Sequence, residues 1–167
     1  ERLYKHAPPE LEVILTVLLH TGARIGELVH VETNPSSHPL TWDRVDTRRG
    51  QLTLWGKGDK RRTVPMTATL RKLFKDLPRH VSSEYVFHRA DGRPLSYHHR
   101  VRPMWTETRK KAKLPEVKLH DLRHTAASNL VNRGATLFDV QNILGHVSPM
   151  TTQRYSHATD DRKRKVI

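Results

Sequence analysis

Hydrophobic residues near the start of the chain recur with a helical period. In PPELEVILTVLLHTG (residues 8–22), Leu11, Ile14, Leu15 and Leu18 are spaced three and four apart, which predicts a helix with one buried face. The two prolines and the acidic residue at its start suit a helix N-terminus. The glycine that closes the segment suits a C-terminal cap.

Further segments show helical patterns between turn signals. The segment over residues 96–113 contains Pro103, which predicts a break or kink in that helix. The last begins with Ser148 as a candidate N-cap and Pro149 at the first helical position. The expected helices span residues 23–31, 67–78, 96–113, 119–134, 136–145 and 148–155.

Between the expected helices over residues 23–31 and 67–78, the helical period gives way to an alternation of apolar and polar positions. Residues 41–66 alternate around Val45, Leu52, Leu54 and Val64, which predicts a small antiparallel sheet. The tight turn GKGDK is expected to project from it. Residues 34–39 read as a loop, 84–88 as a short extended piece and 91–96 as a turn. The fold class is therefore α+β: one mostly helical domain over residues 1–167 with a small antiparallel β-sheet.

The charge balance narrows the function. Thirty Lys and Arg against seventeen Asp and Glu give a net charge of +13, which favours a polyanionic partner such as nucleic acid. The chain has no cysteine, which excludes disulfides and thiolate zinc sites. It also has no apolar run long enough to cross a bilayer and no secretory leader pattern, so we expect no membrane and a cytoplasmic location.

The stretch LHDLRHTAAS (residues 119–128) contains several ionisable side chains close together. His120, Asp121, Arg123 and His124 fall within five positions and are followed by small residues. A buried helix tolerates such groups only where each has a partner. The stretch is therefore expected to face a ligand or a buried polar site, with Asp121 capping the helix start or orienting a cation.

Four stretches in order, TGARIGEL, GKGDKRRTVP, LHDLRH and LGHVSPMTTQRY, carry a resemblance to a known family. Together they resemble the catalytic domain of the tyrosine recombinases, the phage integrase and Xer-type family, from about residue 8 to residue 155. His-x-x-Arg alone would be weak evidence, whereas four stretches in order are a specific signal. The resemblance implies that family's fold and DNA strand exchange.

The resemblance also implies a set of site residues, each within the stretch that matches. The implied catalytic residues are Arg24, Lys57, His120, Arg123, His146 and the nucleophile Tyr155, with Glu27, Asp121 and His124 as supporting residues.

The implied reaction explains why these residue types would be collected. Tyr155 attacks a DNA phosphate and forms a 3′-phosphotyrosine, while Lys57 protonates the departing 5′ hydroxyl. Arg24, Arg123 and His146 offer donors to the phosphate oxygens. A phenol with a pKa near ~10 needs cationic neighbours or a base such as His120. The resemblance implies neither metal nor ATP, and no other cofactor.

Each residue also has a simpler interpretation. Arg24 could pair only with Glu27 on the same turn, and Lys60 competes with Lys57 for the role of general acid. His120 and His124 have the spacing of a metal pair, although no glutamate stands between them. In the same way, His146 could satisfy helix-end carbonyls, and Tyr155 could be an ordinary core aromatic residue.

Three other functions remain as alternatives. Residues 128–155 resemble a helix-turn-helix, which would make the chain a DNA-binding module without catalysis. A type IB topoisomerase would use related chemistry but relax one duplex instead of exchanging strands between two. A metal-dependent hydrolase built on the histidines would lose activity with a chelator.

The resemblance finally implies an assembly. The expected partner is double-stranded DNA, bound by a homotetramer on two sites, with possible accessory DNA-bending proteins, in the nucleoid or on a phage or mobile element of a bacterial host. Residues 1–8 are expected to end an interdomain linker, and the family's N-terminal DNA-binding domain is not found in this chain. Residues 31–39 appear as an insertion, and residues 156–167 as a short C-terminal tail.

Overall fold

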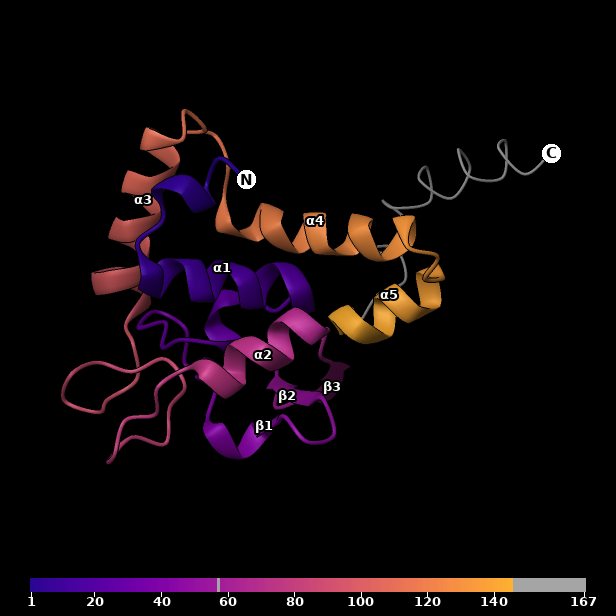
Figure 1. The fold of residues 1–167 in the computed structure, drawn as a ribbon, viewed down its shortest axis with the longest axis horizontal. Helices are drawn as coiled ribbons and strands as arrows, with labels where there is room; N and C mark the ends of the chain where they lie inside the picture. The colour runs from indigo at the N-terminus through magenta and orange to yellow at the C-terminus, as the bar shows by residue number, and fades with distance from the viewer. Residues whose placement is uncertain (57, 146–167) are drawn as a thin grey trace.

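Two long helices run side by side through the middle of the molecule, and the small sheet lies on one side of the pair (Figure 1). The computed structural model describes residues 1–56 and 58–145. The helices are α1 (Pro9–Thr21), α2 (Ala68–Asp76), α3 (Arg102–Lys111), α4 (Leu119–Asn132) and α5 (Leu137–Leu144), the strands are β1 (Val45–Asp46), β2 (Gln51–Trp55) and β3 (Arg61–Pro65), and the short turns are η1 (Tyr4–His6), η2 (Ile25–Glu27), η3 (Trp42–Arg44) and the π-helical turn η4 (Tyr97–Val101).

The central helix α1 is buried because apolar residues cover most of its surface. It packs against α4 on one side and α2 on the other (Figure 1). The predicted stripe of Leu11, Ile14, Leu15 and Leu18 is fully buried, and Val17 joins it. Removing such side chains from water is the main source of stability here, at roughly 1.5–3 kcal/mol for each fully buried aliphatic residue.

A second, smaller core joins α4 to α5. It consists of Ala127, Val131, Val140 and Leu144. The small Ala127 lets the two helices approach closely, as the run of small residues after His124 suggests. Because α5 doubles back beneath α4, its last residues return toward the end of α1 (Figure 1).

The predicted antiparallel sheet is confirmed, with strand order β1-β2-β3. Leu52 lies opposite Val64 and Leu54 lies opposite Arg62, so alternate positions face the core. Leu52, Leu54 and Val64 are buried. After β2, Gly58 lies in the left-handed region, with a φ of +74°.

Two predicted helices differ from the structure. The expected helix over residues 23–31 is only the three-residue turn η2, although Leu28 and Val29 are buried. The chain then extends, and His30 forms an isolated bridge with Ser96. That pairing replaces the hydrogen bonds that a longer helix would have made.

In the expected helix over residues 96–113, the irregularity precedes Pro103 instead of falling on it. The π-helical turn η4 leads directly into α3, and Pro103 occupies the first turn of α3. A proline is tolerated there because the first N–H groups of a helix have no partner within the helix. No described helix is long and apolar enough to span a membrane.

The remaining segments fold onto the surface of the domain. Ser37 fastens the inserted loop of residues 31–39, since its hydroxyl donates to the Val29 carbonyl at 3.0 Å and accepts from the Val31 N–H at 2.9 Å. Residues 84–88, expected as a short extended piece, form no strand: Tyr85 bridges Thr41 and His88 bridges Pro94, with a bend at residues 86 and 87 between them. Near the N-terminus, Tyr4 packs against the core.

Candidate active site

Four of the sequence stretches singled out above meet at one place, where α1 ends, α4 begins and α5 ends. The side chain of Arg123, on α4, donates to the carbonyl of Gly22 after α1 and to the carbonyl of Leu144 on α5. From β3, Arg62 reaches both the turn η2 and α5. The fold therefore gathers distant segments, and the bond from Arg123 to Gly22 alone joins residues 101 positions apart in sequence.

Gly22 creates the turn that presents Arg24. Its φ of +63° ends α1 in a left-handed cap, a conformation that costs glycine little. Arg24 follows in an extended conformation immediately before η2, and its side chain is 40% exposed. The Arg24 guanidinium is therefore held at the surface of the site while its backbone is fixed.

The buried carboxylate of Glu27 stabilises that turn through hydrogen bonds. Its carboxylate accepts the backbone N–H of Arg24 at 2.8 Å and approaches Arg24 Nη1 at 3.4 Å. Its strongest partner is Arg62, whose Nη1 and Nη2 donate to the two carboxylate oxygens at 2.6 and 2.7 Å. Arg24 does pair with Glu27, as the simple interpretation expects, but Glu27 is shared with Arg62 and so also links the Arg24 turn to β3.

Arg123 is almost fully buried, at 3% exposure. Its Nη1 donates to the Gly22 carbonyl, and its Nη2 donates to the Leu144 carbonyl at 2.6 Å. A guanidinium has five N–H groups in a planar fork, and these two bonds use two of them. They fix the plane of the guanidinium and place positive charge at the junction of the three helices.

His120 lies in the same positive region, on the first turn of α4. Burial and then the positive charges of His124, Arg123 and Arg24 lower the pKa of His120 below its ordinary value. The rings of His120 and His124 meet edge to face, with centroids 5.1 Å apart. A neutral His120 at neutral pH can accept a proton, as a general base must.

Asp121 caps α4, one of the two roles expected for it. Its carboxylate accepts the Lys118 N–H at 2.8 Å, ahead of the first helical turn. Within residues 1–56 and 58–145, no group of three histidine or acidic side chains is placed to hold a metal ion.

Three predicted catalytic residues, Lys57, His146 and Tyr155, lie outside the described residues. Their described neighbours adjoin the site. A Cβ on Gly56 would lie 3.2 Å from Glu27 Oε1 and 3.6 Å from Arg24 Nη1. At the other side, Gly145 ends α5 in the left-handed conformation.

Arg62 is the site residue that sequence reasoning missed. The signal was its position in β3, where Arg62 and Val64 share the inward face while Arg61, Thr63 and Pro65 are more exposed. A charged residue at an inward-facing strand position requires a partner. The alternation showed that a partner was needed but not which residue supplies it.

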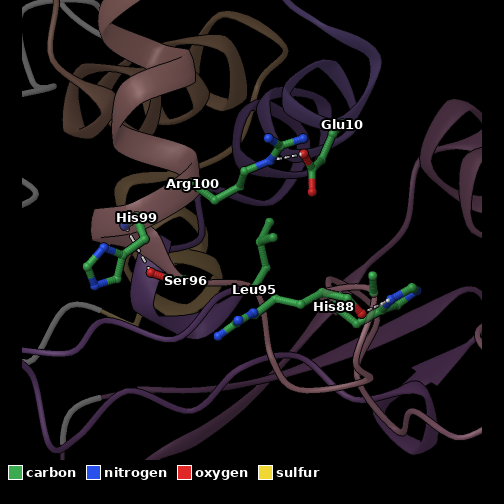
Figure 2. A pocket seen from close by; sticks show the side chains of 8 residues that line it. Glu10, His88, Leu95, Ser96, His99 and Arg100 are labelled. Carbon is green, nitrogen blue, oxygen red and sulfur yellow. Dashed lines mark hydrogen bonds and ion pairs between the residues drawn. The ribbon is translucent and has the colours of Figure 1, made fainter.

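A separate cavity of about 540 Å³ lies near the other end of α1. Figure 2 shows Arg100 of η4 meeting Glu10 of α1 there, with Nε to Oε2 at 2.8 Å, and His88 on the neighbouring loop. Its described lining includes none of the predicted site residues. Glu10 is the one carboxylate in that described lining, and it is paired with Arg100.

Comparison with known proteins agrees with the arrangement of these elements. The model of the phage integrase family matches residues 1–162. The tyrosine recombinase XerC of Staphylococcus haemolyticus is 33% identical over 161 residues, which cover 92% of this chain and 51% of that protein. The crystal structure of XerA recombinase superposes with a TM-score of 0.75 at 30% identity, covering 99% of this chain and 59% of that one.

A second solved structure supports the same fold. The catalytic domain of bacteriophage HP1 integrase matches with a TM-score of 0.67 and 27% identity over 94% of this chain and 80% of that one. The chain spans about half the length of the curated relatives that it matches. The predicted fold class, α+β with a small antiparallel sheet, is thus confirmed by the structure and by its structural neighbours.

Proposed function

Since this chain belongs to the phage integrase family, we propose that it is the catalytic domain of a site-specific tyrosine recombinase. It cleaves and rejoins duplex DNA through a 3′-phosphotyrosine intermediate. The observation that supports this most strongly is the convergence of Arg24, His120 and Arg123 at the junction of α1, α4 and α5.

The two arginines have complementary roles in the proposed reaction. Arg24 is partly exposed and contacts a non-bridging phosphate oxygen. Arg123 is buried, and its positive charge acts on the same phosphate from the interior side of the site. Both are fixed before the substrate binds, so little reorganisation is needed when negative charge develops in the transition state. A donor placed in this way contributes about 3–4 kcal/mol in other enzymes.

The chemical step is a displacement at phosphorus. The Tyr155 oxygen forms a bond to phosphorus as the bond to the 5′ oxygen breaks, and the phenolic proton passes to a base, for which His120 is the candidate. Lys57 protonates the 5′ oxygen, with Lys60 as the alternative acid. His146 donates to the phosphate. Because the phosphotyrosine is again a phosphodiester, a free 5′ hydroxyl can reverse the step without ATP.

The proposed partner is double-stranded DNA, which suits the net charge of +13. Strand exchange joins two duplexes, so the proposed assembly is a homotetramer that holds two sites. Accessory DNA-bending proteins would assist where a site must be deformed.

The test is covalent trapping of the intermediate. The substrate is a pool of nicked duplexes with randomised arms, in which the nick lies a few nucleotides from a candidate cleavage position. Cleavage then releases a short fragment that carries the 5′ hydroxyl. Because this fragment diffuses away, the reverse reaction cannot occur and the adduct accumulates. The longest available form of the protein is mixed with the pool, and adducts that survive denaturation are isolated and sequenced. Tyr155→Phe and EDTA are the controls.

An adduct that persists in EDTA and disappears in Tyr155→Phe supports the recombinase and argues against a metal-dependent hydrolase. Site-specific binding without any adduct would instead favour the helix-turn-helix interpretation. Exchange between two labelled duplexes, compared with relaxation of a supercoiled circle, separates a recombinase from a topoisomerase.

A further inference from the structure

We propose that Arg62 is a positioning residue for the strand-cleavage reaction, fixing the Arg24 turn and the end of α5 relative to each other. This inference rests on the proposed function. Arg62 lies on β3, outside the set of predicted catalytic residues, and its side chain is 10% exposed. Its contacts among the described residues are with Glu27, the Ile143 carbonyl and Gly145, none of which reacts in the proposed step, so Arg62 acts through these neighbours.

The Arg62 guanidinium joins the Arg24 turn to the end of α5 through contacts on both of its edges. On one edge, Nη1 and Nη2 donate to the Glu27 carboxylate at 2.6 and 2.7 Å. On the other edge, Nε donates to the Ile143 carbonyl at 2.9 Å. Glu27 in turn holds the backbone N–H of Arg24. A continuous chain of contacts therefore runs from α5 to the Arg24 turn.

The end of α5 is held by two guanidinium groups at neighbouring carbonyls. Arg62 binds the carbonyl of Ile143, and Arg123 binds that of Leu144. The last carbonyls of a helix lack partners within the helix and carry partial negative charge, so cations are favourable there. Gly145 packs directly on Arg62, because a Cβ on Gly145 would lie 3.0 Å from Arg62 Cδ.

Only arginine can make this set of contacts. Its fork presents two parallel donors to a carboxylate and a third N–H in the same plane. A lysine at position 62 would keep the charge and one contact to Glu27, but its single ammonium cannot also span the distance to the Ile143 carbonyl. Arg62→Lys therefore separates the charge of residue 62 from its bridging geometry.

The experiment compares single-turnover cleavage by the wild type, Arg62→Lys and the double variant Glu27→Gln/Arg62→Gln, on a duplex recovered in the trapping assay. The double variant removes both charges together and keeps a neutral pair that can still fold. The matched control is Arg61→Gln on the same strand, because Arg61 stacks on Trp55 at 4.1 Å and points away from Glu27. Melting temperature and affinity for intact duplex are measured for each protein.

A second substrate carries a methylphosphonate at the cleavage position, which removes the negative charge of one non-bridging oxygen. If Arg62 acts by placing Arg24 on that charge, the variants lose about 100-fold in cleavage rate on the phosphodiester, as a misplacement near 1 Å can cause. The loss shrinks to about tenfold or less on the methylphosphonate, where less charge must be neutralised. Duplex affinity and the Arg61→Gln rate stay within about threefold of the wild type.

Two results would overturn the proposal. One is an Arg62→Lys rate close to that of the wild type. The other is an equal loss on the two substrates, because a destabilised but correctly arranged site loses activity regardless of the charge on the phosphate. If the wild type itself forms no adduct, the proposed function fails, and the role of Arg62 falls with it. If the wild type cleaves and the variants do so equally well, only the role of Arg62 is refuted.

Discussion

The buried pair between Glu27 and Arg62 gives a direct test of the site's architecture in the absence of DNA. The perturbation is Glu27→Gln, which keeps the size and shape of the side chain but removes its charge. Glu27 is 2% exposed, and its carboxylate accepts two bonds from Arg62 and one from the Arg24 N–H. After the substitution, an NH₂ group faces a guanidinium N–H, and the buried Arg62 lacks its carboxylate.

The expected cost follows from that burial. Removing one partner of a buried ion pair destabilises by about 3–5 kcal/mol, because the remaining charge is left in a poorly solvated place. For a domain of this size, 1 kcal/mol corresponds to a melting shift of about 2–4 °C, so the midpoint should fall by about 6–20 °C. The control is Asp76→Asn, since the Lys72–Asp76 pair on α2 is exposed and should leave the midpoint nearly unchanged.

The assay is thermal and urea unfolding followed by circular dichroism, completed as a double-mutant cycle with Arg62→Gln. Because the two residues contact each other directly, their effects should not add, and the coupling free energy should be about 2–3 kcal/mol. A loss in Glu27→Gln no larger than in Asp76→Asn would refute the reasoning. So would a coupling below about 0.5 kcal/mol, which is typical of independent sites.

Three further predictions concern the surroundings of the site. Gly22→Ala should lower the free energy of unfolding by about 2–4 kcal/mol, because the new Cβ would lie 2.2 Å from Leu144 Cδ2 and the left-handed backbone adds strain of about 1–2 kcal/mol. The control is Gly50→Ala, where φ is +68° and the space is open, so only the strain is expected. Equal losses for the two variants in calorimetry would contradict this prediction. Because the pKa of His120 is lowered, its neutral form persists as the pH falls. The cleavage rate should therefore stay level down to about pH 6.5 and decline only below that pH. A decline that begins above about pH 7 would count against His120 as the base. Below about pH 6.5 the unfolded chain protonates this histidine first, so the stability that His120 contributes is present at higher pH and is lost on acidification. Thr136→Ala removes the N-cap of α5 and should cost about 1 kcal/mol in urea denaturation, whereas an unchanged midpoint would show that the cap is dispensable.

The sequence alone determined the elements whose cause is local. The stripe that begins at Leu11 predicts α1 because each turn of a helix repeats its environment, and Gly22 and Gly145 mark helix ends because both require a left-handed backbone. Alternation around Leu52 and Val64 predicts the sheet for the same kind of reason. Even the family could be inferred, because the order and spacing of the motif residues are properties of the chain itself.

Tertiary structure decided the interactions between distant segments. The short turn at residues 25–27 replaced a predicted helix because His30 pairs with Ser96. Glu27 binds most tightly to Arg62, 35 residues away, instead of the neighbouring Arg24. Arg62 reaches a carbonyl 81 residues farther along the chain.

The physical reason lies in what each kind of pattern contains. Periodicity reports which face of an element is buried, since burial repeats with the geometry of that element. It does not report which element covers that face, because a buried charge can be satisfied by any donor or acceptor that the fold brings within about 3 Å. For Arg62, the sequence set the requirement for a partner, and the packing of α1, β3 and α5 selected Glu27 and the Ile143 carbonyl.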